Sequence, residues 1–324
     1  MDIETTIAKN IRIADDKAKY DEACKCLLSE KIILAWIMKS CLEEYKDYDV
    51  NEISEKYIEG TPQVSKVAVL PDETNASMIR GLNTEDTTMT EGTITYDIRF
   101  LAFVPNSKEK IQLIINVEAQ NDFYPGYPLI KRGIYYCSRM ISAQYGTEFV
   151  GSHYEKIKKV YSIWVCTTPP KKWQNSITRY IITEENMIGN VKQEKINYDL
   201  MTVILLCLGE SKDKNYNGVL KLLDTLLSTD TNVQEKKQIL REDFQIQMTQ
   251  RLEREVTEMC NLSKGVEEKG RKKGIEQGKK QGVLVSIINL MKNMHLSELE
   301  AMNVLGISEI EQEEYREMLK NERG

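Results

Sequence analysis

Two carboxylates and one carboxamide lie on neighbouring strands of a predicted β-hairpin. Asp97 lies on the first strand, and Glu118 and Gln120 lie on the second. Like charges directly opposite each other, with Cβ atoms roughly 4.5–5.5 Å apart, destabilise a strand pair unless a cation lies between them. Carboxylate oxygens are ligands that hard divalent cations prefer. The spacing therefore predicts a Mg²⁺ or Mn²⁺ site; the alternative is two solvated acids on the wet face of a sheet.

The hairpin itself is defined by two runs rich in β-branched and aromatic side chains, 93–104 and 111–120, with turn residues between them. Folding about Ser107 and Lys108 gives facing residues whose numbers sum to 215. A slip of one residue would exchange the two faces, so the alternation favours this register. One face then pairs Asp97 with Glu118 and Arg99 with Asn116, and the other is apolar, with the pairs Ile98–Val117, Phe100–Ile115 and Ala102–Leu113.

The elements around the hairpin predict a mixed α/β fold. Apolar residues at helical spacing indicate helices, and short apolar runs bounded by turn residues indicate strands. We expect helices over 16–46, 51–59 and 129–144, strands over 64–70, 160–166, 177–182 and 200–207, and a long polar loop over 71–92.

Basic residues collect after the hairpin. Between residues 127 and 182 nine lysines and arginines stand against two glutamates, a local excess of +7 in a chain of net charge −6. Such a region suits contact with a phosphate backbone. On the helix over 129–144 we expect a buried stripe of Ile130, Ile134, Cys137 and Ile141. The predicted phosphate contacts are Lys131, Arg132, Tyr136 and Arg139; the alternative is an ordinary amphipathic helix.

The motif Tyr96-Asp97-Ile98-Arg99, followed about twenty residues later by Ile115-Asn116-Val117-Glu118-Ala119-Gln120, resembles the D…(E/Q)-x-(K/Q) signature of PD-(D/E)XK nucleases. More closely, the chain resembles the PD-(D/E)XK nuclease family transposases, which are related to recombination-promoting nucleases. This resemblance implies a restriction-endonuclease-like αβββαβ core with a mixed sheet. It also implies that Asp97, Glu118 and the carbonyl of Ala119 hold the metal. The parent motif has a lysine where this chain has Gln120, which puts full activity in doubt.

Further residues carry the same resemblance, which extends from about residue 20 to about residue 209. Asp21, Lys25 and Leu28 resemble the D-x-x-x-K-x-x-(L/F) opening of the family, and Arg132-x-x-x-Tyr136 matches its helix pattern. Glu30 lies where many such folds place an accessory acid. The alternatives are a surface acid at Glu30 and a simple helix ion pair between Asp21 and Lys25.

Composition bounds the remaining possibilities. No apolar run approaches the roughly 20 residues that span a bilayer, and the acidic start lacks the features of a signal peptide. Seven scattered cysteines without a C-x-x-C pair suggest reduced packing residues rather than a zinc site. We therefore expect a cytoplasmic protein without a membrane partner.

The C-terminal part differs from the rest of the chain. The predicted organisation is a nuclease-like domain over 1–209, a helical extension over 210–264, and a last region over 265–324. Helical patterns cover 218–227, 233–259, 283–294 and 297–320. A repeat places glycines 270, 274, 278 and 282 on one helical stripe. The repeat predicts either a marginal helix that orders on dimerisation or DNA binding, or a flexible charged linker.

Together these features predict a magnesium-dependent DNA endonuclease associated with recombination or transposition. A homodimer, formed through the C-terminal helical region, would suit a double-strand break. The alternative of another class is a catalytically weak or inactive nuclease-like fold that serves as a DNA-binding or oligomeric module. A regulatory scaffold has less support. The acids at 97 and 118 favour the enzyme, whereas the net negative charge and Gln120 favour the module.

Overall fold

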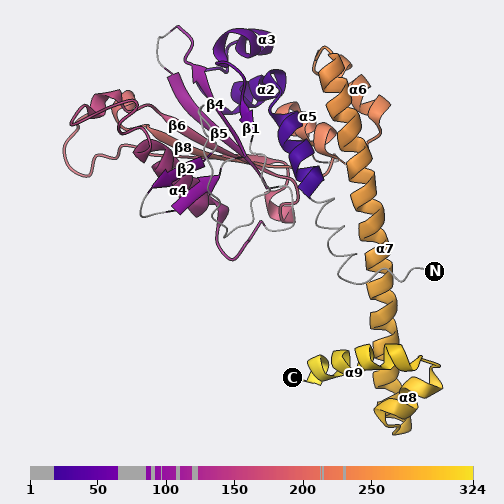
Figure 1. Ribbon diagram of the computed structural model, residues 1–324. Coiled ribbons are helices and arrows are strands. Elements are labelled where there is room, and N and C mark those ends of the chain that lie inside the picture. Colours follow the sequence, from indigo (N-terminus) through magenta and orange to yellow (C-terminus); the bar gives the residue numbers. More distant parts are fainter. Residues whose placement is uncertain are drawn as a thin grey trace. The chain divides into compact units, whose positions relative to one another are not determined.

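The computed structural model confirms the α/β class, with a mixed sheet flanked by helices (Figure 1). It describes residues 18–64, 85–88, 92–95, 97–106, 110–118, 123–211, 213, 215–228 and 231–323. Six strands form the main sheet in the order β1-β4-β5-β6-β8-β7. β5, β6 and β8 are parallel to one another, whereas β4 and β7 run antiparallel to their neighbours. The bounds are β1 Gln63–Val64, β4 Ile98–Phe103, β5 Lys110–Glu118, β6 Val160–Cys166, β7 Ser176–Ile181 and β8 Met201–Cys207.

The central hairpin has the predicted faces but not the predicted register. In β4 and β5 Ile98 pairs with Ile115 and Phe100 with Leu113, so facing numbers sum to 213 rather than 215. The turn is therefore centred one residue earlier, next to Asn106, whose φ of 58° is a left-handed conformation that asparagine tolerates. A shift of two residues keeps every side chain on its face. The predicted opposition of Asp97 to Glu118 is wrong for the same reason.

The first strand of this hairpin is shorter than predicted. Residues 93–104 do not form one strand, because β3 (Gly92–Thr95) pairs with β2 (Glu85–Thr88) in a separate two-stranded sheet. β4 starts only at Ile98, and Asp97 lies in a bend before it. The prediction of a loop is thus wrong for 85–88, because these residues form a strand that pairs antiparallel with β3. Of the strand predicted over 64–70, residues 65–70 lie outside the described part of the chain.

The main sheet has an apolar core on each face. On β6, Tyr161, Ile163 and Val165 belong to one core, and Val160, Trp164 and Cys166 belong to the other. The first core is covered by the helix over 18–28, by α2 (Lys31–Cys41) and by α5 (Gly218–Leu227). The second is covered by α4 (Leu129–Ser142), on the opposite side of the sheet in Figure 1. The fold therefore has three layers, helices, sheet and helix, and β6 and β8 are buried on both faces.

The predicted helix over 16–46 is broken in two. Its first part runs over 18–28, and α2 starts at Lys31. The Ser29 hydroxyl donates to the carbonyl of Cys26 at 2.7 Å, and Glu30 is extended with φ −62° and ψ 127°. The serine hydroxyl thus satisfies a carbonyl at the helix end, which makes the break possible without Gly or Pro. The short helix predicted over 51–59 is α3 (Val50–Glu52), which continues into a π-helical turn over Ile53–Tyr57.

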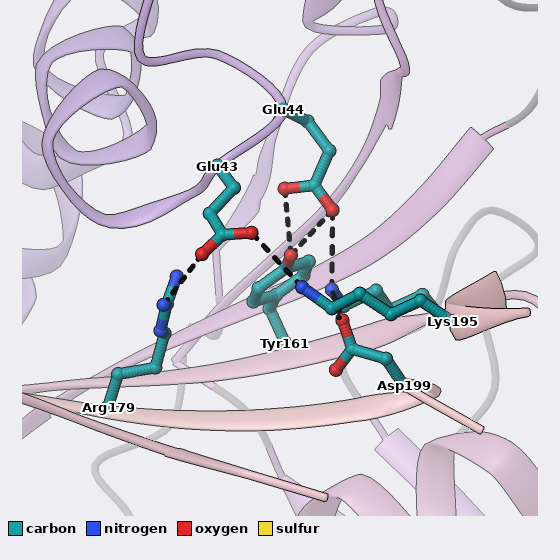
Figure 2. A network of polar contacts seen from close by, with 7 residues as sticks. Glu43, Glu44, Tyr161, Arg179, Lys195 and Asp199 are labelled. Carbon is teal, nitrogen blue, oxygen red and sulfur yellow. Dashed lines mark hydrogen bonds and ion pairs between the residues drawn. The ribbon is translucent and has the colours of Figure 1, made fainter. Parts of the chain in front are cut away.

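A polar network fastens the turn after α2 to the start of the parallel strands (Figure 2). The Tyr161 hydroxyl donates to both carboxylate oxygens of Glu44, at 2.7 and 2.8 Å. Glu43 accepts from Arg179 of β7 at 2.7 Å and from Lys195 at 3.1 Å. Lys159 binds Asp199 at 2.7 Å. Each carboxylate in this network accepts from a cationic or hydroxyl donor on another element. The network therefore links the turn after α2 to β6, β7 and the segment before β8.

The C-terminal helices are α5, α6 (Val233–Glu242), α7 (Gln250–Met294), α8 (Glu298–Val304) and α9 (Glu309–Arg323). The predicted helix over 233–259 is interrupted at 243–249, where Gln245 has a positive φ. The glycine repeat lies within α7, so the structure shows a helix there rather than a linker. The chain divides into two compact units, Met1–Ser263 and Lys264–Gly324, and the second has its own apolar core around Ile287.

Candidate functional site

Asp97 is part of a buried ion cluster with two residues of the first helix. The Lys25 ammonium lies 2.9 Å from Asp97 Oδ1 and 2.6 Å from Asp21 Oδ2. Lys25 is 2% exposed and Asp97 is 9% exposed. The helix over 18–28 positions this lysine because Cys24, Leu27 and Leu28 bury the adjacent face against the sheet. Two of the predicted accessory residues, Asp21 and Lys25, therefore lie beside the predicted metal ligand.

Electrostatics keeps this lysine charged. Burial alone would lower the pKa of Lys25, but the carboxylates of Asp97 and Asp21 outweigh it and raise that pKa overall. Burial raises the pKa of Asp21, Lys25 lowers it in part, and the negative charge of Asp97 raises it further. Asp97 thus has a permanent cation at one of its oxygens.

Glu118 ends β5, and its backbone lies opposite Cys166 of β6 in the parallel ladder. The side chain of Glu118, and Ala119 and Gln120, lie outside what the structure describes. If the hairpin register continued by one residue, Asp97 would lie opposite Asn116, which makes Glu118 its diagonal neighbour. Diagonal neighbours are roughly 7–8 Å apart, still within reach of long side chains. Among the described side chains no cluster of three or more His, Cys, Asp or Glu could hold a metal ion.

Arg132 and Tyr136 form a rigid pair on α4. Arg132 Nε donates to the Tyr136 hydroxyl at 2.9 Å, and its guanidinium lies over the rings of Tyr136 and Trp164. Burial raises the pKa of Tyr136, Arg132 lowers it in part, and the charge of Asp97 adds to the rise. Tyr136 is itself buried, with its ring packed on Trp164. Its hydroxyl accepts the hydrogen bond from Arg132.

The buried face of α4 differs from the predicted stripe. Leu129, Gly133, Tyr136, Cys137 and Met140 face the sheet, whereas Ile134 is 45% exposed. A Cβ at Gly133 would lie only 2.5 Å from Val203, so the missing side chain lets the helix approach β8 closely. Of the predicted stripe, Cys137 is buried and Ile130 and Ile141 are half-buried against the same core, so the prediction is wrong only for Ile134.

The remaining predicted residues divide between two environments. Lys131 is exposed on α4, as a phosphate contact requires. Arg139 is only 3% exposed and donates to the Tyr135 hydroxyl at 3.2 Å, which argues against a contact with DNA. Glu30 points to another part of the chain, with Arg251 Nε at 2.7 Å. Burial raises the pKa of Glu30, and the Glu255 carboxylate raises it further. Glu30 is therefore not brought to Asp97.

Two lysines that were not predicted as contacts lie near the same end of the sheet. Lys171 and Lys172 are exposed on a short 3₁₀ turn that follows β6, whose last residue lies opposite Glu118. Trp173 of that turn packs on Phe123, which comes five residues after Glu118 in the chain. The signal in the sequence was the basic excess after residue 127, which did not say which lysines share the site.

Comparisons of the chain with family models, with curated proteins and with solved structures found no match. Among the helices that the structure describes, none combines the length and the apolar character needed to cross a membrane.

Proposed function

We propose that the chain is a magnesium-dependent DNA endonuclease of the PD-(D/E)XK type. The observation that carries this proposal is the buried Asp97, which lies immediately before the start of β4 and is held by Lys25. Glu118 lies at the end of β5, the antiparallel neighbour of β4, and α4 carries the Arg132–Tyr136 pair.

The order of elements supports this reading. Along the main sheet, the helix over 18–28 comes first, followed by β1, β4 and β5 and then by α4 and β6, and the four strands are adjacent in the order β1-β4-β5-β6. With α2, α3 and the separate β2–β3 pair left out, this order supports the αβββαβ core that the sequence resemblance implies. The predicted ligands then occupy the start of β4 and the end of β5, the middle pair of strands.

The donor atoms suit a hard cation. Asp97 presents a carboxylate that already accommodates one cation, the ammonium of Lys25. Asp97, Glu118 and the Ala119 carbonyl would supply the oxygens that Mg²⁺ or Mn²⁺ prefers. When bound, the metal would supply Lewis acidity and lower the pKa of a bound water.

The chain's own residues would bind and orient the substrate. Lys25 holds the Asp97 carboxylate in position through an ion pair at 2.9 Å. Arg132, held over two aromatic rings, offers donors for one phosphate, and exposed Lys131, Lys171 and Lys172 would attract its neighbours. Gln120 can orient a water by hydrogen bonds but carries no charge.

A second function is favoured by one specific observation. Lys25 already neutralises Asp97 within the fold, as in a purely structural ion pair. A nuclease-like module that binds DNA or partner proteins without cutting would keep this pair for stability and have no need of a metal.

Cleavage of supercoiled plasmid with Mg²⁺ or Mn²⁺ tests the two functions. The variants are Asp97→Asn and Glu118→Gln, and exposed Glu155→Gln is the matched control because it lies on a 3₁₀ turn away from the cluster. The enzyme predicts metal-dependent nicking that falls at least about 100-fold in the two site variants, while the control cuts like wild type. If wild type cuts nothing and all four proteins retard DNA equally, the catalytic proposal gives way to the module.

A further inference from the structure

β7 is an edge strand with an uncovered face. Within the described residues it pairs only with β8, and it is the last strand of the sheet. Exposure alternates along it, and Ile177, Arg179 and Ile181 are the exposed members. Their neighbours on β8, Leu206 and Ile204, are fully buried under the helices. The helical layer therefore covers β8 and leaves the isoleucines of β7 in solvent.

The segment that follows extends the apolar surface. Residues 182–197, which we name the arm, are all exposed. Met187 and Ile188 at the middle of the arm are 92% and 96% exposed, and Val191 and Ile196 are also mostly exposed. Isolated surface hydrophobics are ordinary, but several exposed aliphatic residues on an edge strand and on the segment directly after it indicate an interaction surface.

The size of this surface can be compared with that of a stable interface. Burying one large aliphatic side chain removes roughly 60–120 Å² of apolar area from water. Ile182 raises the exposed aliphatic residues on β7 and the arm to seven, which together offer on the order of 300–500 Å² of apolar area. A standard interface covers about 800 Å² per partner, a little over half of it apolar. The exposed apolar area of β7 and the arm therefore matches the apolar part of one side of a standard interface.

We propose that a second copy of this chain docks on this surface, through antiparallel pairing of the two β7 strands about a twofold axis. Pairing of identical strands keeps each face intact only when facing numbers have an even sum. A sum of 358, centred on Arg179, uses the whole exposed stretch. It places Ile177 opposite Ile181 of the second copy, twice, on the uncovered face. The two arms would then close over this apolar strip.

Charge also suits a second copy. The twofold axis brings Arg179 opposite its own counterpart, and like charges in that position destabilise a sheet. Each Arg179, however, already binds Glu43 at 2.7 Å, and Glu43 also binds Lys195. The arm itself carries both signs, with Glu184, Glu185, Lys192 and Lys195. A strongly acidic or strongly basic partner would face like charges as well as opposite ones on this surface. A second copy carries both signs, so its acids can face the lysines of the first copy.

Sedimentation of the full chain over a concentration series tests this interface. Met187→Asp and Ile188→Asp place a charge on side chains that support no part of the fold, and should raise the dimer dissociation constant at least about tenfold. Met294→Asp is the matched control, because Met294 is 60% exposed in the second unit. It should dimerise like wild type.

Three results would overturn the proposal. The first is a wild-type protein that stays monomeric at every concentration, which would mean that a different occupant covers the patch. The second is dimerisation of the arm variants with the affinity of wild type. The third is a dimer that Met294→Asp separates and the arm variants do not, which would assign the interface to the C-terminal helices.

Cysteine cross-linking tests the register independently of affinity. Only residue 179 faces its own counterpart in the proposed pairing, at a Cα separation of roughly 4.5–5.5 Å that a disulfide spans. Arg179→Cys should therefore form a covalent dimer under mild oxidation. Ser138→Cys, on the exposed side of α4, should not. Equal cross-linking of the two variants, or none at position 179, would contradict the register.

Discussion

The ammonium of Lys25 is enclosed between two carboxylates that come from distant parts of the chain. Asp21 is four residues away on the same helix, whereas Asp97 arrives from the start of β4. A charge buried this deeply depends on its partners, because removing one member takes away an attraction that offsets the cost of burying the others. The stability of the fold and the charge state of the candidate site therefore depend on the same lysine.

Lys25→Met tests that dependence at the scale of one residue. The variant removes the cation shared by buried Asp97 and partly exposed Asp21, so we expect the free energy of unfolding to fall by about 3 kcal/mol or more. Urea denaturation at neutral pH measures it. Lys56→Met is the control, since Lys56 pairs with Glu52 in solvent and its loss should not be detectable. An equal, small effect of both substitutions would show that the cluster does not stabilise the fold.

The pH dependence of Glu43 gives a second prediction at this scale. Hydrogen bonds from Arg179 and Lys195 lower the pKa of Glu43 from 4.5 to about 2. Because the folded-state pKa lies below the unfolded one, the pairing stabilises the fold fully above pH 4.5 and is lost as the pH falls toward 2. Glu43 is half exposed, so solvent screening limits the effect to at most about 1 kcal/mol. Wild type and Glu43→Gln should differ at pH 6 and converge near pH 2 in urea denaturation; a constant difference would contradict the assignment.

At the scale of elements, α4 shows what a hydrophobic pattern can and cannot predict. The pattern gave the helix bounds closely, as α4 spans Leu129–Ser142. It failed for Ile134, which is exposed, and it gave no sign that Gly133 lets the helix approach Val203 closely. The hairpin shows the same division: alternation fixes which face a residue occupies, but the position of the turn fixes its partner. Asp97 precedes Ile98, the first paired residue of β4, so it does not face Glu118 as predicted.

Gly133→Ala tests the close approach of α4. The added Cβ meets Val203, a stiff β-branched side chain, so overpacking should cost about 1–3 kcal/mol, offset in part by about 1 kcal/mol of helix propensity. We expect a net loss of up to about 2 kcal/mol in thermal or urea unfolding. Gly278→Ala in α7 is the control, because its Cβ would meet open space and should be neutral or stabilising. If Gly133→Ala is also neutral, the helix can shift and its packing does not depend on glycine.

At the scale of the whole molecule, the chain has two compact units with separate apolar cores. The second unit has about 60 residues, which at ordinary stability per residue gives only about 3–9 kcal/mol. Ile287→Ala should remove about 2–5 kcal/mol from its core. Hydrogen exchange should then show lost protection after residue 264 and unchanged protection in the sheet, with half-exposed Ile275→Ala as the control. Loss of protection in both units together would show that they unfold as one.

The candidate site could be predicted from the sequence only in part. The spacing of Asp21 and Lys25 identified a helix ion pair, and it forms. Nothing local indicated that Lys25 also reaches Asp97, because that contact depends on how the first helix packs on the sheet. The exposure of Met187 and Ile188 was equally hidden, since apolar residues in a strand-rich region are expected inside.

The exposure of Met187 has a chemical consequence. Its thioether meets dissolved oxidants directly, whereas Met38 and Met140 are enclosed in the two cores of the sheet. Conversion to the sulfoxide replaces an apolar tip with a polar one. In peroxide-treated protein, mass spectrometry should find Met187 oxidised well before the buried methionines. Met187 is the most exposed of the methionines that the structure describes, so oxidative ageing would alter the arm long before it reached the packing of the fold.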